Sequence, residues 1–275
     1  MRVAIMVACY NRKELTKRCL GSLKNQVVGK GNQFDIYVYD DGSTDGTCEM
    51  LEEEFAFVQI IRGKGSAYWC KSMHHLMKTA SEKNYDFYMM INDDAYFYTD
   101  AVEKMFRTYD KVNKSCGIVG AFQSSISGKG TYGGRDQQMS LLMPNGQIQQ
   151  CIWADWNAFL IDANVVKKTG IIDGKYQHAW GDWDYSYRMT KKGIPIYTTA
   201  EYIGECEVNS VENTFRDSAL KRGVRFRKLI APKGLPFYSY TRYHVRTKGI
   251  AGFFIAIYGY FSIAAYILFG KDFKR

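Results

Sequence analysis

The first 122 residues repeat one pattern: a short apolar run is followed by a stretch with helical periodicity. The apolar runs, which predict buried strands, are residues 2–8, 35–39, 58–61, 87–91 and 118–122. The predicted helices between them include residues 13–25, 68–83 and 101–112. Strands that alternate with helices of this length form crossover units, in which the strands lie parallel. The sequence therefore predicts an α/β fold with a mainly parallel sheet between helices.

Three of the predicted strands end in amide or carboxyl side chains. These are Asn11 after the first run, Asp40 and Asp41 after the second, and Asn92, Asp93 and Asp94 after the fourth. In open α/β sheets, ligands bind beyond the carboxyl ends of the strands. Two adjacent acids at the edge of a core repel each other unless water or a divalent cation neutralises them. We therefore expect a ligand site at this edge.

The middle of the chain returns to the sheet and then enters a second polar segment. Residues 124–150 are rich in Gly, Ser and Gln, which is typical of an inserted segment, and residues 151–161 predict a strand that carries Asp155 and Asn157. A short helix is expected over residues 163–169, before the Gly170 stop.

Residues 178–193, HAWGDWDYSYRMTKKG, predict a helix that starts at an Asp182 N-cap and stops at Gly193. Asp184 and Arg188 lie four residues apart, so one interpretation is a capped helix with a surface ion pair. The other is a sugar site. Trp180 and Trp183 then form a wall for a sugar ring, and the neighbouring acid is a candidate general base.

The C-terminal fifth is basic and then apolar. Ten of the 37 Lys and Arg residues lie between positions 216 and 248, where Asp217 is the one acid, and residues 250–269 carry no charge. Twenty apolar residues can cross a bilayer, lie in its interface or form a buried core helix. Basic residues beside such a segment favour anionic lipid, so we expect a tail that docks on the cytoplasmic face of the membrane. Nucleic-acid binding is the weaker explanation of the charge.

The seven cysteines are scattered and contain no CxxC pair, which indicates reduced thiols rather than disulfides or a zinc site. Residues 1–12 reach Asn11 and Arg12 too early for a signal peptide, which agrees with a cytoplasmic location.

Four segments, in order, resemble family-2 inverting glycosyltransferases of the GT-A fold, which use nucleotide-diphosphate sugars. They are VACYNR (7–12), YDDGSTDGT (39–47), INDDA (91–95) and GIIDGKYQHAWGDWDYSYRMTKKGIPI (170–196). The resemblance implies a GT-A domain over residues 1–205, with a nucleotide-sugar half (1–123) and an acceptor and catalytic half (124–205). Residues 206–275 then resemble the basic and apolar helical extensions of membrane-associated members.

The same resemblance implies roles for single residues. Asp41 would contact the nucleotide base in a pocket lined by Ala8, Tyr10 and Asn11. Asp94 would bind Mg²⁺ or Mn²⁺, and Asp93 would lie near the ribose or the metal. Asp182 would be the catalytic base. The residues expected at the acceptor or sugar are Asp155, Asn157, Trp180, Trp183, Asp184 and Arg188. Lys71 is either a ligand of the diphosphate or a solvated lysine.

Two positions and one segment depart from the family pattern. Asn92 replaces the first acid of the DxD-like cluster, Gly181 replaces the glutamate before the base, and residues 63–73 are closer to rhamnosyltransferase-like members. The expected function is metal-dependent transfer from a UDP- or dTDP-sugar to a glycan or lipid-linked hydroxyl. A degenerate module that binds the sugar nucleotide without turnover is the alternative. A dehydrogenase is disfavoured because no GxGxxG opens the first helix.

Overall fold

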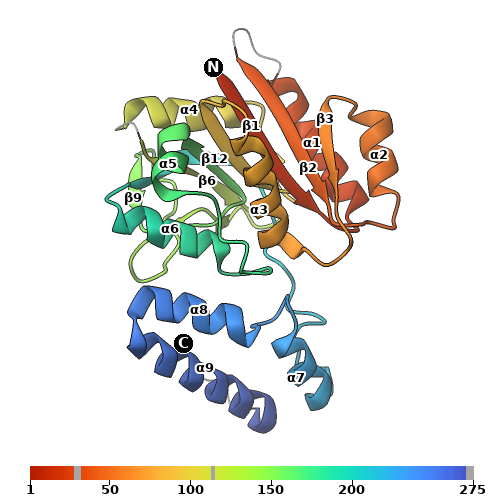
Figure 1. Ribbon diagram of the computed structural model, residues 1–275, viewed down its shortest axis with the longest axis vertical. Helices are drawn as coiled ribbons and strands as arrows, with labels where there is room; N and C mark the ends of the chain where they lie inside the picture. Colours follow the sequence, from red (N-terminus) through yellow and green to blue (C-terminus); the bar gives the residue numbers. More distant parts are fainter. Residues whose placement is uncertain (28–31, 113–114, 271–275) are drawn as a thin grey trace.

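The computed structural model describes residues 1–27, 32–112 and 115–270, and Figure 1 shows its arrangement. Within these residues the core is one ten-stranded sheet. Its strands are β1 (Arg2–Cys9), β2 (Gln33–Asp40), β3 (Val58–Arg62), β4 (Phe87–Asn92), β5 (Tyr96–Phe97), β6 (Gly117–Gln123), β7 (Gly130–Tyr132), β9 (Gln149–Cys151), β11 (Ala158–Asp162) and β12 (Ile196–Glu205). β8 (Gly134–Arg135) and β10 (Trp153–Ala154) form a separate pair.

The strand order β3-β2-β1-β4-β11-β6-β12-β5 combines parallel and antiparallel pairs. β3, β2, β1 and β4 are parallel neighbours, and β6 is parallel to β12, so the prediction of a mainly parallel sheet is confirmed. β11 runs antiparallel between β4 and β6. The register places Ala8 at the end of β1 beside Asn92 at the end of β4, which brings the loops after both strands to one edge.

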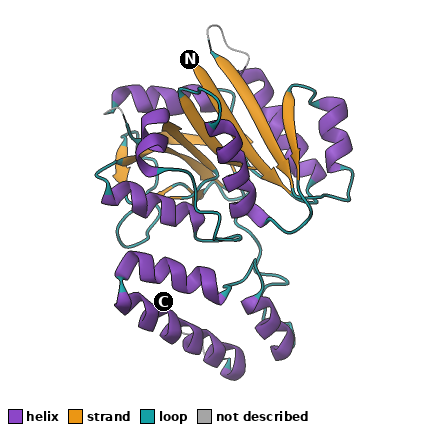
Figure 2. Ribbon diagram, in the orientation of Figure 1, coloured by secondary structure: helices purple, strands orange, loops and turns teal. Residues whose placement is uncertain are grey.

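Helices cover both faces of the sheet (Figure 2). One face packs against α1 (Lys13–Val27), α2 (Thr47–Glu54) and α4 (Ala101–Lys111). The other packs against α3 (Tyr68–Ser81), α5 (Ala163–Thr169) and α6 (Gly181–Lys191). Every residue of β1 from Val3 to Cys9 is buried, because alternate side chains enter the two helical layers. This explains why the strand appears as a continuous apolar run.

The predicted strand over residues 151–161 is wrong in its middle. Cys151 ends β9 and Ala158 begins β11, and the two strands pair with different neighbours. Asp155 and Asn157 therefore lie in a connection rather than in a ladder. The chain bends there because Asp155 is held by side-chain and backbone donors, including Arg135 Nε at 3.0 Å. This bend carries Asp155 to the ligand edge of the sheet.

The basic C-terminal region forms three helices, α7 (Arg222–Ile230), α8 (Phe237–Lys248) and α9 (Ile250–Phe269), which lie below the sheet in Figure 1. The predicted apolar segment 250–269 is one continuous helix. Its side toward α8 is lined by small residues: a Cβ on Gly252 would lie 1.9 Å from the His244 carbonyl oxygen. Only 17% of its most apolar window is buried, which rules out the buried core helix.

Two arginines of α8 attach the C-terminal helices to α6 and the segment before it. Arg246 Nη1 donates to Asp184 at 2.8 Å, and Arg246 Nη2 and Arg242 Nη2 donate to Asp173 Oδ2 at 3.0 and 2.7 Å. β12 ends at Glu205, and the predicted domain boundary after that residue stays a prediction.

Replacing Arg246 by methionine is expected to destabilise the protein by about 3 kcal/mol, because Asp184 is fully buried and would lose one of its two cationic partners. Urea denaturation measures the change. Lys248→Met, two residues along and exposed, is the matched control and should stay within about 0.5 kcal/mol of wild type. An Arg246→Met protein as stable as the control would contradict this role.

Candidate active site

The first turn of α3 is where the segments named in the sequence meet. Asp41, directly after β2, is buried, and its two oxygens accept backbone N–H bonds from Gly65 to Tyr68 at 2.8–3.2 Å. Gly63 permits this approach, because a Cβ there would lie 2.7 Å from Asp41 Oδ1. Both carboxylate oxygens of Asp41 are thus engaged by backbone N–H groups. The predicted contact of Asp41 with a nucleotide base stays a prediction.

The next two residues of α3, Trp69 and Cys70, contact the end of β4 and the segment before α6. Trp69 Nε1 donates to Asn92 Oδ1 at 2.8 Å, so the amide that replaces an acid at position 92 has a defined partner. Cys70 N donates to the Gln177 carbonyl at 3.0 Å, and a Cβ on Gly181 would meet Cys70 Sγ at 2.3 Å. A glutamate therefore does not fit at position 181 in this arrangement. The segments around positions 41, 92 and 181 thus converge on one helical turn.

Asn11 ties β1 to the acidic loop after β2. Its backbone has a φ of 51°, its N–H donates to Ser43 Oγ at 2.9 Å, and its Oδ1 accepts from Thr44 N at 2.7 Å. Of the other residues predicted for the nucleotide pocket, Ala8 is buried, whereas Tyr10 is exposed and lies near Gly65. Lys71 is partly buried on α3, without a protein acceptor among the described residues.

Arg12 bridges the two acids that follow β4. Its Nη1 lies 3.0 Å from Asp93 Oδ1 and 2.9 Å from Asp94 Oδ2. Asp93 Oδ2 is buried and has no hydrogen-bond partner in the described structure. Burial raises the pKa of Asp93 to about 6, an effect that Arg12 opposes and the charge of Asp94 reinforces. Arg12 had no predicted role, although a positive charge beside two adjacent acids was to be expected.

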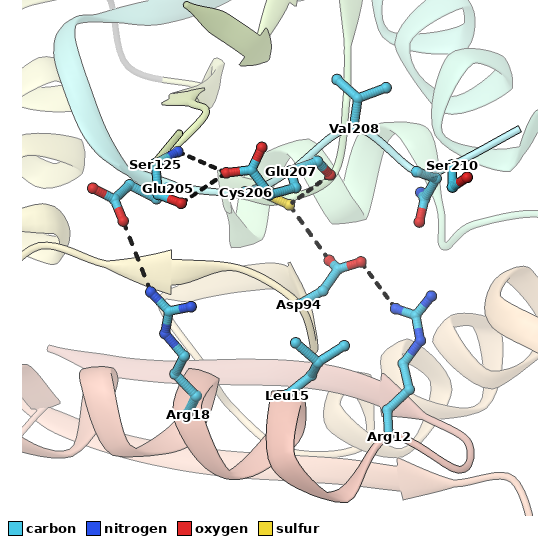
Figure 3. A pocket seen from close by; sticks show the side chains of 11 residues that line it. Arg12, Leu15, Arg18, Asp94, Ser125, Glu205, Cys206, Glu207, Val208 and Ser210 are labelled. Carbon is cyan, nitrogen blue, oxygen red and sulfur yellow. Dashed lines mark hydrogen bonds and ion pairs between the residues drawn. The ribbon is translucent and has the colours of Figure 1, made fainter. Parts of the chain in front are cut away.

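Asp94 also lines a hollow of about 240 Å³ that opens to solvent (Figure 3). Arg12 and Arg18 of the α1 region form one side, and residues 205–210 form the other. Asp94 Oδ1 accepts from the buried Cys206 thiol at 3.6 Å, and Asn157 Nδ2 donates to the same sulfur at 3.2 Å. Asn157 is therefore linked to Asp94 through the Cys206 thiol. Its predicted contact with the acceptor stays a prediction.

Asp182 has few protein partners for a partly buried carboxylate. The predicted N-cap is wrong: α6 begins at Gly181, and Trp180 precedes it with a φ of 79° and no side-chain cap. Asp182 Oδ1 accepts one bond, from Trp183 N at 2.9 Å. Burial, and then the charge of Asp155, raise the pKa of Asp182 to about 7. A carboxylate with that proton affinity is suited to general-base chemistry near neutral pH.

Asp155 is the charged neighbour of Asp182. Its carboxylate pairs with Arg135 Nη2 at 3.0 Å and accepts from Trp183 Nε1 at 3.2 Å. Trp183 therefore contacts both acids: its indole N–H donates to Asp155, and its backbone N–H donates to Asp182. Arg135 gave no signal in the sequence, because its partner Asp155 lies in a connection 20 residues further along the chain.

The acceptor contacts predicted for Asp184, Arg188 and Trp180 stay predictions, and in the structure all three residues contact other parts of the protein. Asp184 is fully buried and accepts from Tyr176 Oη, Arg188 Nε and Arg246 Nη1, so neither oxygen is open to a sugar. Arg188 also donates to two backbone carbonyls. The Trp180 ring packs against the aromatic rings of α8, with Tyr243 at 4.8 Å between centroids. Asp184 and Trp180 therefore link α6 to α8, and the Asp184–Arg188 ion pair is internal, not on the surface.

The family model for glycosyl transferase family 2 matches residues 4–173. The chain belongs to this family. Its relatives include protein RfbJ of Shigella flexneri, 28% identical over 102 residues, which are 37% of this chain and 71% of RfbJ. Poly-β-1,6-N-acetyl-D-glucosamine synthase of Staphylococcus aureus strain COL is 27% identical over 136 residues, which are 46% of this chain but only 31% of the synthase.

Solved structures show the same fold at low sequence identity. TarS 1–349 of S. aureus in complex with UDP-GlcNAc has a TM-score of 0.60 at 12% identity, over 98% of this chain and 76% of that one. The mannosyltransferase PcManGT of Pyrobaculum calidifontis, in complex with GDP-Man and Mn²⁺, has a TM-score of 0.56 at 11% identity, over 96% and 75%. The predicted GT-A fold is confirmed.

The acids after β4 fit a divalent cation in a glycosyltransferase of this kind. The described residues contain no cluster of three or more His, Cys, Asp or Glu side chains that could hold a metal ion. Mg²⁺, however, keeps several waters and is held by one or two carboxylates together with substrate phosphates. Asp93 and Asp94 supply two carboxylates, and the unpartnered Asp93 Oδ2 shows that protein donors do not use all of their oxygens.

Proposed function

We propose that the protein is an inverting, metal-dependent glycosyltransferase that transfers a hexose-type sugar from a UDP- or dTDP-sugar to a hydroxyl of a glycan or lipid-linked acceptor in cell-envelope polysaccharide synthesis. The observation that carries the proposal is Asp182, a carboxylate with a near-neutral pKa and one backbone partner, in the segment that contacts the first turn of α3. The sequence of residues 63–73, which is closer to rhamnosyltransferase-like members, is our ground for proposing that branch.

In this mechanism Asp182 takes the proton of the acceptor hydroxyl as that oxygen attacks the anomeric carbon from the face opposite the leaving group. Burial, and then the charge of Asp155, which is held by Arg135 and Trp183, raise the pKa of Asp182 and so its affinity for that proton. A cation bound by Asp93 and Asp94 would neutralise charge that develops on the leaving diphosphate. The backbone bonds to Asp41 keep the first turn of α3 in place beside these groups.

The C-terminal helices support a lipid-linked acceptor at the cytoplasmic face of the membrane. α9 is long and apolar enough to cross a membrane, and its exposed side carries Phe254, Tyr258 and Phe261. It also lies along α8, whose arginines are bound to Asp173 and Asp184. We therefore propose that α9 lies in the plane of the interface, because crossing the bilayer would separate it from α8 or draw those charges into lipid.

A thermal-shift screen of UDP-, dTDP- and GDP-sugars, each with and without Mn²⁺, tests the proposed function. A donor at about 100 times its Kd should stabilise the native state by about 2.7 kcal/mol, and this gain should depend on Mn²⁺. The best donor is then incubated with the protein, and release of the free nucleoside diphosphate is measured. Stabilisation without release would identify the degenerate binding module instead. No stabilisation by any donor would contradict both.

A further inference from the structure

Arg12 holds the same two carboxylates that a catalytic cation would need, and it does so through a single nitrogen. Asp93 Oδ1 and Asp94 Oδ2 both accept from Nη1, at 3.0 and 2.9 Å. A divalent cation that joined these two oxygens would have to lie at about 2.0–2.6 Å from each, between the two carboxylates. Nη1 already lies between them, so the guanidinium and the cation exclude each other there.

The position of Arg12 follows from the fold. Asn11 fixes the turn between β1 and α1 through Ser43 and Thr44. The parallel register of β1 and β4 then sets the residues after Ala8 beside the residues after Asn92. Arg12 thus reaches the acids across two strand ends, although they are more than 80 residues away in sequence.

The arginine is held loosely enough to move. Its side chain is 37% exposed, and it lines the hollow beside Asp94 (Figure 3). Among the described residues, Nε and Nη2 have no protein acceptor, so most of the guanidinium donors stay available. Arginine donors in this planar arrangement match phosphate oxygens well.

We propose that Arg12 occupies the cation's place in the free enzyme, and that the cation displaces it onto the diphosphate of the nucleotide. One positive charge only partly neutralises two carboxylates, so a divalent cation is the stronger ligand once diphosphate oxygens complete its shell. The displaced arginine then binds the same diphosphate. Metal and nucleotide binding are thereby coupled through one side chain. This inference rests on the proposed metal dependence, but not on turnover.

The test compares wild type with Arg12→Gln in two binding measurements that do not use activity. In the first, Mn²⁺ alone is titrated by electron paramagnetic resonance, and we expect Arg12→Gln to bind it about tenfold more tightly. In the second, UDP is titrated calorimetrically in Mg²⁺ and in EDTA. We expect Arg12→Gln to weaken UDP binding about tenfold or more in Mg²⁺ and to leave it within about twofold in EDTA, where Arg12 is still bound to the acids.

Arg18→Gln is the matched control, because Arg18 lines the same hollow, lies 3.8 Å from Glu205 and does not touch the two acids. It should reproduce the wild-type pattern. Unchanged or weaker Mn²⁺ binding by Arg12→Gln would overturn the proposal, as would an equal loss of UDP affinity in Mg²⁺ and EDTA. Arg12→Met, which also removes the charge, replaces the glutamine variant if the latter does not fold, with the same two criteria. Tighter Mn²⁺ binding with no binding of UDP, or of dTDP in the same titration, would refute the proposed function while leaving the displacement of Arg12 by the cation standing.

Discussion

Replacing Asp182 by asparagine is expected to reduce sugar transfer by about 1,000-fold or more while making the protein more stable. The loss of activity follows because an amide cannot accept the proton of the acceptor hydroxyl, and positioned bases contribute about 10²–10⁴-fold. Nucleotide binding should stay within about twofold of wild type. Asp182 lies on α6, whereas the two acids proposed to hold the cation follow β4.

The gain in stability follows from the direction of the pKa shift. Burial raises the pKa of Asp182 to about 7 from an ordinary 3.8, so the native state holds this proton more tightly than the unfolded state. Ionisation therefore costs stability as the pH rises from about 4 to about 7, and the cost persists above that range. Asparagine does not ionise, so at pH 8 the variant should gain about 1–3 kcal/mol, and at pH 3 nothing.

Product release and thermal melts at pH 3 and pH 8 measure both effects on the same samples. Asp110→Asn, an exposed residue of α4, is the matched control and should change neither. Retained turnover by Asp182→Asn would remove Asp182 from its role. Asp155→Asn provides a second check: without that negative charge the pKa of Asp182 should fall, so the acid limb of the pH–rate profile should move to lower pH.

The strands and helices of the first half were predictable because they are determined locally. β1, β2, β4 and β6 are apolar runs buried on both faces, and the structure extends each predicted run by one to three residues. The direction of β11 was not predictable, because an apolar run has the same pattern in a parallel and an antiparallel ladder. The bend at Asp155 had no local signal either, since it depends on Arg135.

The candidate site divides in the same way. The spacing of Asp184 and Arg188 predicted their pairing. The second partner of Asp184, Arg246, lies 62 residues further along the chain, on α8, and had no local signal. Trp180 was expected to face a sugar because aromatics near acids are typical of such sites, and α8 was not part of that argument. Arg12 was within reach of sequence reasoning, because it follows the strand parallel to the one that ends in the two acids.

Replacing Phe254, Tyr258 and Phe261 together by glutamate is expected to release the protein from anionic lipid vesicles. These side chains are 65%, 68% and 72% exposed and recur at i, i+4 and i+7, on the side of α9 away from Gly252 and Ala256. Each aromatic buried in the interface is worth about 1 kcal/mol or more, so the triple variant should lose at least about 100-fold in partitioning.

Vesicle co-sedimentation measures the loss, and alkaline carbonate extraction measures how α9 is inserted. Phe57, Ile126 and Val211 are also exposed apolar residues, and their triple glutamate variant is the matched control. It should still bind, more strongly to anionic than to zwitterionic vesicles, because the basic residues of 216–248 are attracted to anionic headgroups. Carbonate should extract wild type if α9 lies in the plane of the interface, since α8 and its ion pairs then stay in water. Resistance to carbonate would mean that α9 crosses the bilayer and that α8 does not lie along it in the membrane-bound enzyme.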